Sequence, residues 1–294
     1  MKKSLFLIPA LLLVLTSCNV DNTQTSSTTN NSTNTTQTTN TTTTSNTTNT
    51  KPSESIGNKV SKDDIYNLIE EKNYQLPSSY IVNVNGETEI ENKFVSNDGE
   101  EQTSTTKQEV STEFAYDFRD ENDYYLRSIS RNAMIISSSG IQTSTLIEYT
   151  KKTEDGYVAV SIQDGEVSES NTTKEDIVKA ASSFAQGFIL SKQTFDSMLN
   201  MFFSNKEPEF YINSNDKVTI QGEASMNTGA DISVDAYMQI RFDEFGMLTY
   251  LNMANGTLET TSDGEDGINY IKVNLSMKYE GSSNCDVAHI EVTE

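Results

Sequence analysis

Few side chains in this chain combine the types and the spacing that catalysis or metal binding requires. The chain has one histidine, His289, and two cysteines, Cys18 and Cys285, too few for a zinc site made of the usual nitrogen and sulfur ligands. The sequence contains no G-x-S-x-G nucleophile elbow, no glycine-rich phosphate loop and no dinucleotide fingerprint. The S-x-x-K spacing occurs from Ser104 to Lys107 and from Ser214 to Lys217, without the companion motifs of penicillin-binding enzymes. We therefore predict that the protein is not an enzyme and has no catalytic residue, no metal ion and no cofactor.

Carboxylates are abundant, but they form no recognisable site. With 43 acidic residues, chance pairs are certain, so a pair alone does not indicate glycosidase chemistry. The densest cluster, Asp263-Gly264-Glu265-Asp266-Gly267, lacks the spacing of an EF-hand loop; it could hold calcium weakly, and a solvated hairpin turn is the simpler interpretation. The net charge of −22 repels phosphate backbones, so the sequence predicts no nucleic-acid partner.

Cys18 has a role that its neighbours indicate. The chain opens with Met1-Lys2-Lys3 and continues as an apolar run from Leu5 to Leu15, and small residues then lead into the cysteine. The stretch Leu15-Thr16-Ser17-Cys18 resembles the lipobox of bacterial lipoproteins. The resemblance implies that residues 1–18 are a lipoprotein signal with its lipobox cysteine, and that cleavage before Cys18 leaves this residue as the lipidated N-terminus. The apolar run is shorter than the roughly 20 residues that cross a bilayer and contains Pro9, whereas two acyl chains suffice as an anchor. An ordinary signal peptide that happens to contain a cysteine is the alternative.

Residues 19–58 form a tether between this anchor and the folded part. They consist largely of Thr, Asn and Ser, and such a tract cannot bury enough surface to offset its ordering entropy. A flexible linker of this length has a root-mean-square reach of roughly 35 Å. We expect an extracytoplasmic protein held at the cell membrane by its lipid, with one folded domain over residues 59–294. If Cys18 is acylated, Cys285 has no partner for a disulfide.

The first half of the folded part predicts a short helix followed by strands. Ser61 three residues before Asp64 is a capping pattern, and Ile65, Leu68 and Ile69 follow with helical spacing to about Lys72. From Ser79 to about Val167 apolar residues alternate with polar ones, and turn residues interrupt them. This pattern is typical of about five antiparallel strands with one buried face.

The second half predicts a two-helix insertion and then long strands. Thr173 and Ser191 are candidate N-caps, and apolar stripes follow each of them. Six successive even positions from Ile232 to Phe242 are apolar, Asp243-Glu244-Phe245-Gly246 fits a type I turn closed by a glycine bulge, and a second alternating strand runs from Ile271 to Tyr279. We expect a C-terminal strand that carries Cys285 and His289 as ordinary residues.

This order of elements resembles the LolA-like lipoprotein-carrier superfamily, and the stretch from Tyr237 to Tyr250 is similar to a strand-turn-strand of that group. The resemblance implies an α+β fold: a large curved antiparallel sheet, or half-barrel, with the N-terminal helix and the two-helix insertion packed on its concave face around an acyl-chain cavity. The ligand-binding residues would then be inward residues of the strands (Ile232, Val234, Met238, Ile240, Val273, Leu275, Met277) and of the helices (Phe184, Phe188, Phe195, Met198, Phe202). The same side chains would also line a solid core.

Two functions therefore stand as hypotheses. The first is a membrane-anchored lipoprotein that binds a lipid or another hydrophobic ligand in its interior. The second is a surface interaction or structural lipoprotein with a solid core, which binds a protein or glycan partner. The sequence leaves the oligomeric state open.

Overall fold

The computed structural model describes residues 56–290, except 137–139, 204–205, 228–232 and 265–266. The predictions for the signal, for Cys18 and for nearly all of the tether lie outside these residues. The helices are α2 (Lys62–Lys72), α3 (Lys174–Ala185) and α4 (Lys192–Phe202). The strands are β1 (Asn58–Val60), β2 (Ser79–Ser96), β3 (Glu101–Asp117), β4 (Tyr125–Ile136), β5 (Gly140–Thr153), β6 (Gly156–Gln163), β7 (Glu166–Thr172), β8 (Glu209–Ile212), β9 (Val218–Asn227), β10 (Ser233–Phe242), β11 (Leu248–Gly264) and β12 (Gly267–Ser283).

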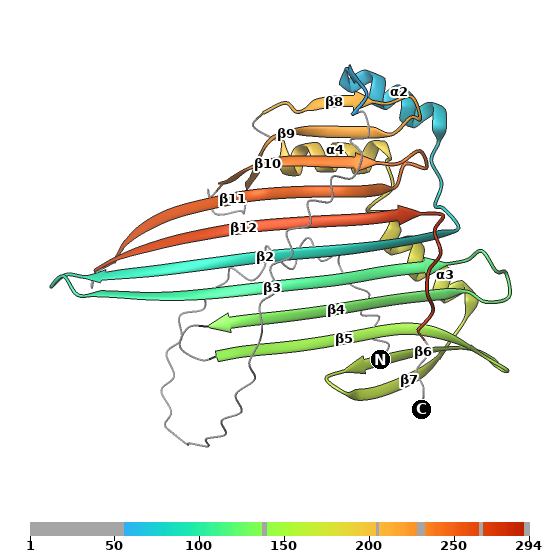
Figure 1. Ribbon diagram of the computed structural model, residues 1–294, viewed down its shortest axis with the longest axis horizontal. Helices are drawn as coiled ribbons and strands as arrows, with labels where there is room; N and C mark the ends of the chain where they lie inside the picture. The colour runs from blue at the N-terminus through green and yellow to red at the C-terminus, as the bar shows by residue number, and fades with distance from the viewer. Residues whose placement is uncertain (1–55, 137–139, 204–205, 228–232, 265–266, 291–294) are drawn as a thin grey trace, which may run out of the picture.

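All twelve strands belong to one antiparallel sheet, which is curved and open (Figure 1). The strand order is β1-β8-β9-β10-β11-β12-β2-β3-β4-β5-β6-β7, so β1 and β7 are the two edges. The last strand, β12, pairs with β2 over its whole length, from Gly267 opposite Ser96 to Ser283 opposite Tyr80. The predicted large antiparallel sheet is thus confirmed in its coarse form, and the C-terminal strand closes the middle of the sheet, not an edge.

Each helix begins at the cap that the sequence predicts. The Ser61 hydroxyl accepts a hydrogen bond from the Asp64 amide at 3.2 Å, and the Asp64 carboxylate accepts one from the Ser61 amide at 2.8 Å, which completes a capping box. Thr173 and Ser191 cap α3 and α4 in the same way, each accepting from a backbone amide at 3.1 Å. None of the helices in the described part of the chain has the length and apolar character needed to cross a membrane.

The main core lies between the three helices and one face of the sheet, which we call the inner face. Buried residues of α2, α3 and α4 form a single cluster with inner-face residues of β2, β3, β4 and β8 to β12. At its centre the Tyr80 hydroxyl donates to the Leu248 carbonyl at 2.7 Å. Because a phenol has one proton to give, the Tyr279 hydroxyl, also 2.7 Å from that of Tyr80, must act as the donor in the second bond.

The two faces of the central strands differ completely in charge. Successive residues of a strand point to opposite faces, so the observed registers place even-numbered residues of β2, β3 and β4 and odd-numbered residues of β12 on the inner face. None of these inner positions carries a charged side chain. The charged residues of these strands all lie on the outer face: Glu87, Glu89, Glu91, Lys93, Glu101, Lys107, Glu109, Glu113, Asp117, Arg127, Arg131, Lys272, Lys278 and Glu280.

The turn between β10 and β11 forms as the sequence predicts. Gly246 has a φ of 72°, which favours glycine, and a bulge follows Arg241 in the register of the two strands. The Asp243 side chain organises the turn, since Oδ1 accepts from the amides of Phe245 and Met247 and Oδ2 accepts from the Ser283 hydroxyl. Burial raises the pKa of the Asp243 carboxyl above its ordinary value in spite of these bonds.

The expectation of a C-terminal strand at Cys285 and His289 is wrong. Residues 284–290, the C-terminal strap, have no ladder partner and instead cross the outer face beside the ends of β2, β3 and β4 (Figure 1). Val287 is buried there against Ala115, Tyr125, Tyr149 and Val160, and the His289 ring stacks on Tyr125 with centroids 4.0 Å apart. Arg127 donates to the Ala288 carbonyl, and the Tyr125 hydroxyl accepts from the Ile290 amide. The apparent alternation arose because the strap alternately contacts the sheet and faces water.

Candidate functional site

The residues predicted from β10 and β12 point into the protein. Met238 and Ile240 have no exposed surface, and Val273, Leu275 and Met277 are each less than a tenth exposed. Ile232 lies outside the described residues. Val234 lies on β10 opposite Met226 of β9, in a stretch where only the backbone is described. The regular alternation of these two strands was therefore a sufficient signal for the direction of the described side chains.

The aromatic residues predicted from the helices meet the same face. Phe195 and Phe202 of α4 are buried, and Met198 packs against the core with part of its surface exposed. Phe184 of α3 stacks on Phe114 of β3 with ring centroids 3.5 Å apart. Phe188, which follows α3, lies 5.2 Å from the ring of Tyr279.

Except for Val273, all described side chains of the predicted set belong to the one main cluster or pack against it. The predicted site lacked Tyr80, Phe114 and Tyr116, although these residues supply much of its aromatic surface. Their alternation with polar residues on β2 and β3 was visible in the sequence. The sequence did not show which strand would face which helix, because that depends on the order of strands in the sheet.

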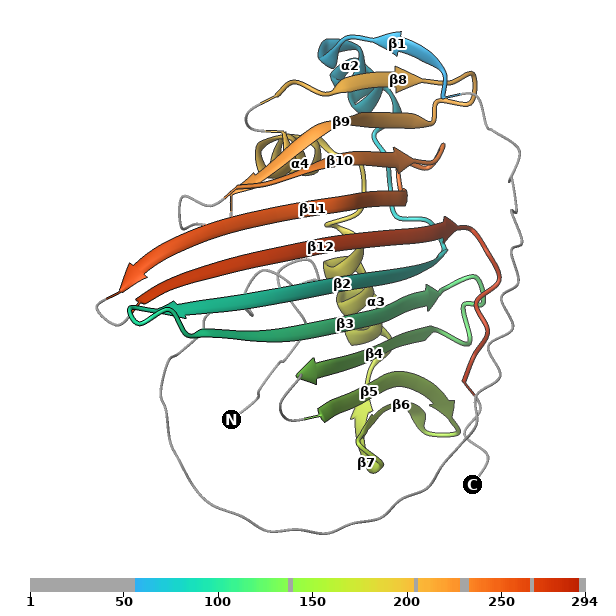
Figure 2. The same ribbon diagram turned by 60° about the vertical axis from the view of Figure 1, so that its left-hand side comes forward.

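A second apolar group lies on the inner face beyond this cluster. Val273, Ile90, Thr106 and Ile136 stand opposite one another in a row across β12, β2, β3 and β4. Val110 and Met134 lie on the same face nearer the core. We call the apolar members the distal inner face: Ile90, Val110, Met134, Ile136 and Val273. None of them is part of either packed hydrophobic cluster in the described chain. Figure 2 shows β2, β3, β11 and β12 extending well past α3 and α4.

One carboxylate stands on the inner face in the row of Val82 and Phe114, at the edge of the main cluster and four residues along β5 from the row of Val110. Glu148 of β5 lies between Ser128 of β4 and Ser161 of β6 in the register of the sheet. Burial raises the pKa of its carboxyl above the ordinary value. Among the residues described, none forms a hydrogen bond or an ion pair with Glu148, and no group of three or more His, Cys, Asp or Glu side chains could hold a metal ion. The inner surface can therefore hold apolar groups and offers a polar point at Glu148.

Comparisons with known proteins assign no family to the chain. No protein-family model matches the sequence, and no curated protein matches it. Among solved structures, the crystal structure of Neisserial surface protein A (NspA) aligns with 8% identity over 68% of this chain and 96% of that chain. The TM-score is 0.11, a value that carries no information about a shared fold.

Proposed function

We propose that this protein is an extracytoplasmic bacterial lipoprotein, anchored through a lipid on Cys18, whose inner face binds a lipid or another hydrophobic ligand. The observation that supports the proposal is the distal inner face, whose apolar side chains stand among uncharged polar ones such as Thr106 and Gln108 and continue the buried face of the sheet beyond the packed core. In this proposal the sheet is a half-barrel of an α+β fold, and the helices lie on its concave side, as the resemblance to LolA-like carriers implies.

The physical argument is the cost of leaving such a surface in water. Large contiguous apolar surfaces on soluble proteins mark sites of interaction or ligand binding. The distal inner face carries Ile90 and Val110 on neighbouring strands, and the inner positions around them bear no charge. Burial of apolar area is worth about 25 cal/mol per Å², so an acyl chain laid along this surface stabilises the complex without any specific contact. Hydrogen-bonding groups such as Glu148 would then orient the ligand.

The experiment is a lipid inventory of the mature protein made without its anchor, with Cys18→Ser. The protein is purified from a bacterial host, extracted with organic solvent and analysed by mass spectrometry. We expect a hydrophobic compound at close to one molecule per protein. A folded protein that yields no such compound, and that takes up no fatty acid added afterwards, would contradict the proposal and favour the solid-core interaction lipoprotein.

A pair of substitutions on one strand gives a matched control. Ile90→Lys places a charge on the distal inner face, and Glu91→Lys places the same charge on the outer face one residue away. Because a charge is strongly disfavoured next to an acyl chain, Ile90→Lys should abolish co-purification of the ligand, whereas Glu91→Lys should leave it intact. Equal ligand content in the two variants would place the ligand elsewhere.

A further inference from the structure

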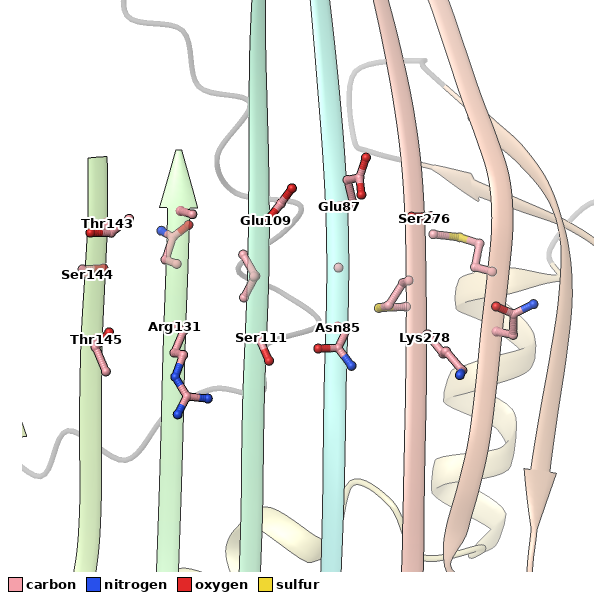
Figure 3. Close-up of a pocket in the computed structure, with 17 residues that line it drawn as sticks. Asn85, Glu87, Glu109, Ser111, Arg131, Thr143, Ser144, Thr145, Ser276 and Lys278 are labelled. Carbon is pink, nitrogen blue, oxygen red and sulfur yellow. The ribbon is translucent and has the colours of Figure 1, made fainter. Parts of the chain in front are cut away.

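The outer face carries a groove whose two walls the proposed function does not use. It is a cleft of about 560 Å³ that crosses β5, β4, β3, β2, β12 and β11 (Figure 3). Its floor is the backbone of a row of residues whose side chains point to the inner face: Ser144, Asn132, Val110, Gly86, Met277 and Met253. Six strands spaced by about 4.8 Å give the groove a length of about 24 Å. Its side walls are two rows of outer-face residues, separated along the strands by two positions, or about 7 Å. One wall consists of Thr145, Arg131, Ser111, Asn85, Lys278 and Asn252. The other contains Thr143, Ala133, Glu109, Glu87 and Ser276.

The walls offer both donors and acceptors. Arg131 and the amide of Asn85 supply donors on the first wall, and the carboxylates of Glu87 and Glu109 supply acceptors on the second. The Lys107 Nζ lies 3.1 Å from a Glu87 carboxylate oxygen and 3.0 Å from one of Glu109, so this single cation offsets one of the two negative charges. Within the described part of the chain, the side chains of Asn85, Ser111 and Arg131 form no hydrogen bond with one another or with other protein groups. Their hydrogen-bonding capacity is therefore available to a ligand.

We propose that this groove binds a linear, uncharged polysaccharide lying across the strands. Sugar hydroxyls both donate and accept hydrogen bonds, which suits walls that present amide, guanidinium and carboxylate groups together. The net charge of −22 disfavours a polyanion such as a nucleic acid or an acidic glycan.

An extended peptide fits this groove less well. A peptide that crosses the strands cannot pair its backbone with the sheet, because the amides and carbonyls of β2, β3 and β4 are already paired in their own ladders. Its own backbone groups would have to be satisfied by the wall side chains alone. A glycan has no backbone amides to pair with a strand, and its hydroxyls can find their partners among the wall side chains and in water along the roughly 24 Å of the groove.

The test uses the mature protein with Cys18→Ser and three probes: cellohexaose, chitohexaose and maltohexaose. We expect isothermal titration calorimetry to show saturable binding of at least one of them. Asn85→Leu removes a donor and an acceptor from the wall and should weaken that binding at least ten-fold. Asn83→Leu, on the same strand and face but outside the groove, is the matched control and should change it less than two-fold. Both residues are exposed, so both variants should keep the urea midpoint of the parent protein.

The proposal is overturned if none of the three hexasaccharides binds to the folded protein. It is also overturned if Asn85→Leu and Asn83→Leu weaken the binding equally, because the sugar would then lie elsewhere. Capture of members of a random peptide library by the groove, lost in Asn85→Leu, with no sugar binding would establish a peptide site in its place.

Discussion

Two valines on the inner face distinguish a packed core from a ligand-binding surface. Val82 of β2 has no exposed surface and belongs to the main cluster, whereas Val110 of β3 lies on the distal inner face. Substitution of each by alanine removes the same two carbon atoms. Any difference between the two variants therefore reports on their surroundings and not on the chemistry of the change.

The expected loss for Val82→Ala follows from burial. Two methyl groups transferred to water cost about 1.6 kcal/mol, and the cavity left in a rigid core brings the loss to about 2–3 kcal/mol. In a domain of this size that corresponds to a fall of about 5–10 °C in Tm. Val110→Ala should cost less than about 1 kcal/mol in ligand-free protein, because its side chain is not part of a packed cluster.

The assay is urea unfolding of the delipidated mature protein followed by far-UV circular dichroism, since the chain has no tryptophan. The m-values of parent and variants must agree for the comparison to hold. If Val110→Ala loses as much stability as Val82→Ala, the distal inner face is solidly packed and the ligand proposal fails. If Val82→Ala loses almost nothing, the cluster around the helices is itself hollow.

Three further outcomes follow from buried polar groups and from the strap. Tyr80→Phe should lower the free energy of unfolding by about 2–4 kcal/mol and Tyr279→Phe by about 1 kcal/mol. Only the first substitution leaves both the Leu248 carbonyl and the Tyr279 hydroxyl without a partner. If thermal unfolding shows the larger loss for Tyr279→Phe, the assigned donors are wrong. The raised pKa of Asp243 means that the folded state holds its proton more tightly, so the stability from this group is present below its ordinary pKa of 3.8 and is lost as pH rises through the raised value. Asp243→Asn should therefore flatten the profile of urea midpoint against pH between 4 and 7, and an unchanged slope would assign that slope to another group. A chain that lacks the C-terminal strap should unfold at lower temperature and bind the dye ANS at the uncovered outer cluster, and unchanged dye binding would show that the strap covers little apolar surface.

Local signals in the sequence predicted the elements well. The caps at Ser61, Thr173 and Ser191 and the turn at Asp243–Gly246 each depend on residues three or four positions apart, and all four occur as predicted. Pairing over long distances was not predictable in this way. Nothing within β12 indicates that it lies beside β2. The two strands are almost 200 residues apart in the sequence, and their pairing depends on how the whole chain between them folds.

The candidate site was predicted where apolar residues alternate without interruption. Met238, Ile240, Leu275 and Met277 occupy such positions, and they point inward. Val110 was missed because Gln108 and Thr112, its neighbours on the same face, are polar, and the period of two disappears from a hydrophobicity pattern there. The charged residues still show the period of two, since every lysine and glutamate of β3 stands at an odd position and so on the outer face.

The restriction of charged residues to the outer face along the whole strand is the strongest support for the proposed ligand on the inner face. If the sheet needed a buried side only under α3 and α4, charged residues could occupy either face of β2 once the strand has passed the helices. Instead Glu89, Glu91 and Lys93 all remain on the outer face, and Ile90 and Phe94 remain on the inner one. Charges are disfavoured on a surface only where water is excluded from it. In a chain of net charge −22 an uncharged inner strip that reaches the end of the strand is what the proposed hydrophobic ligand requires.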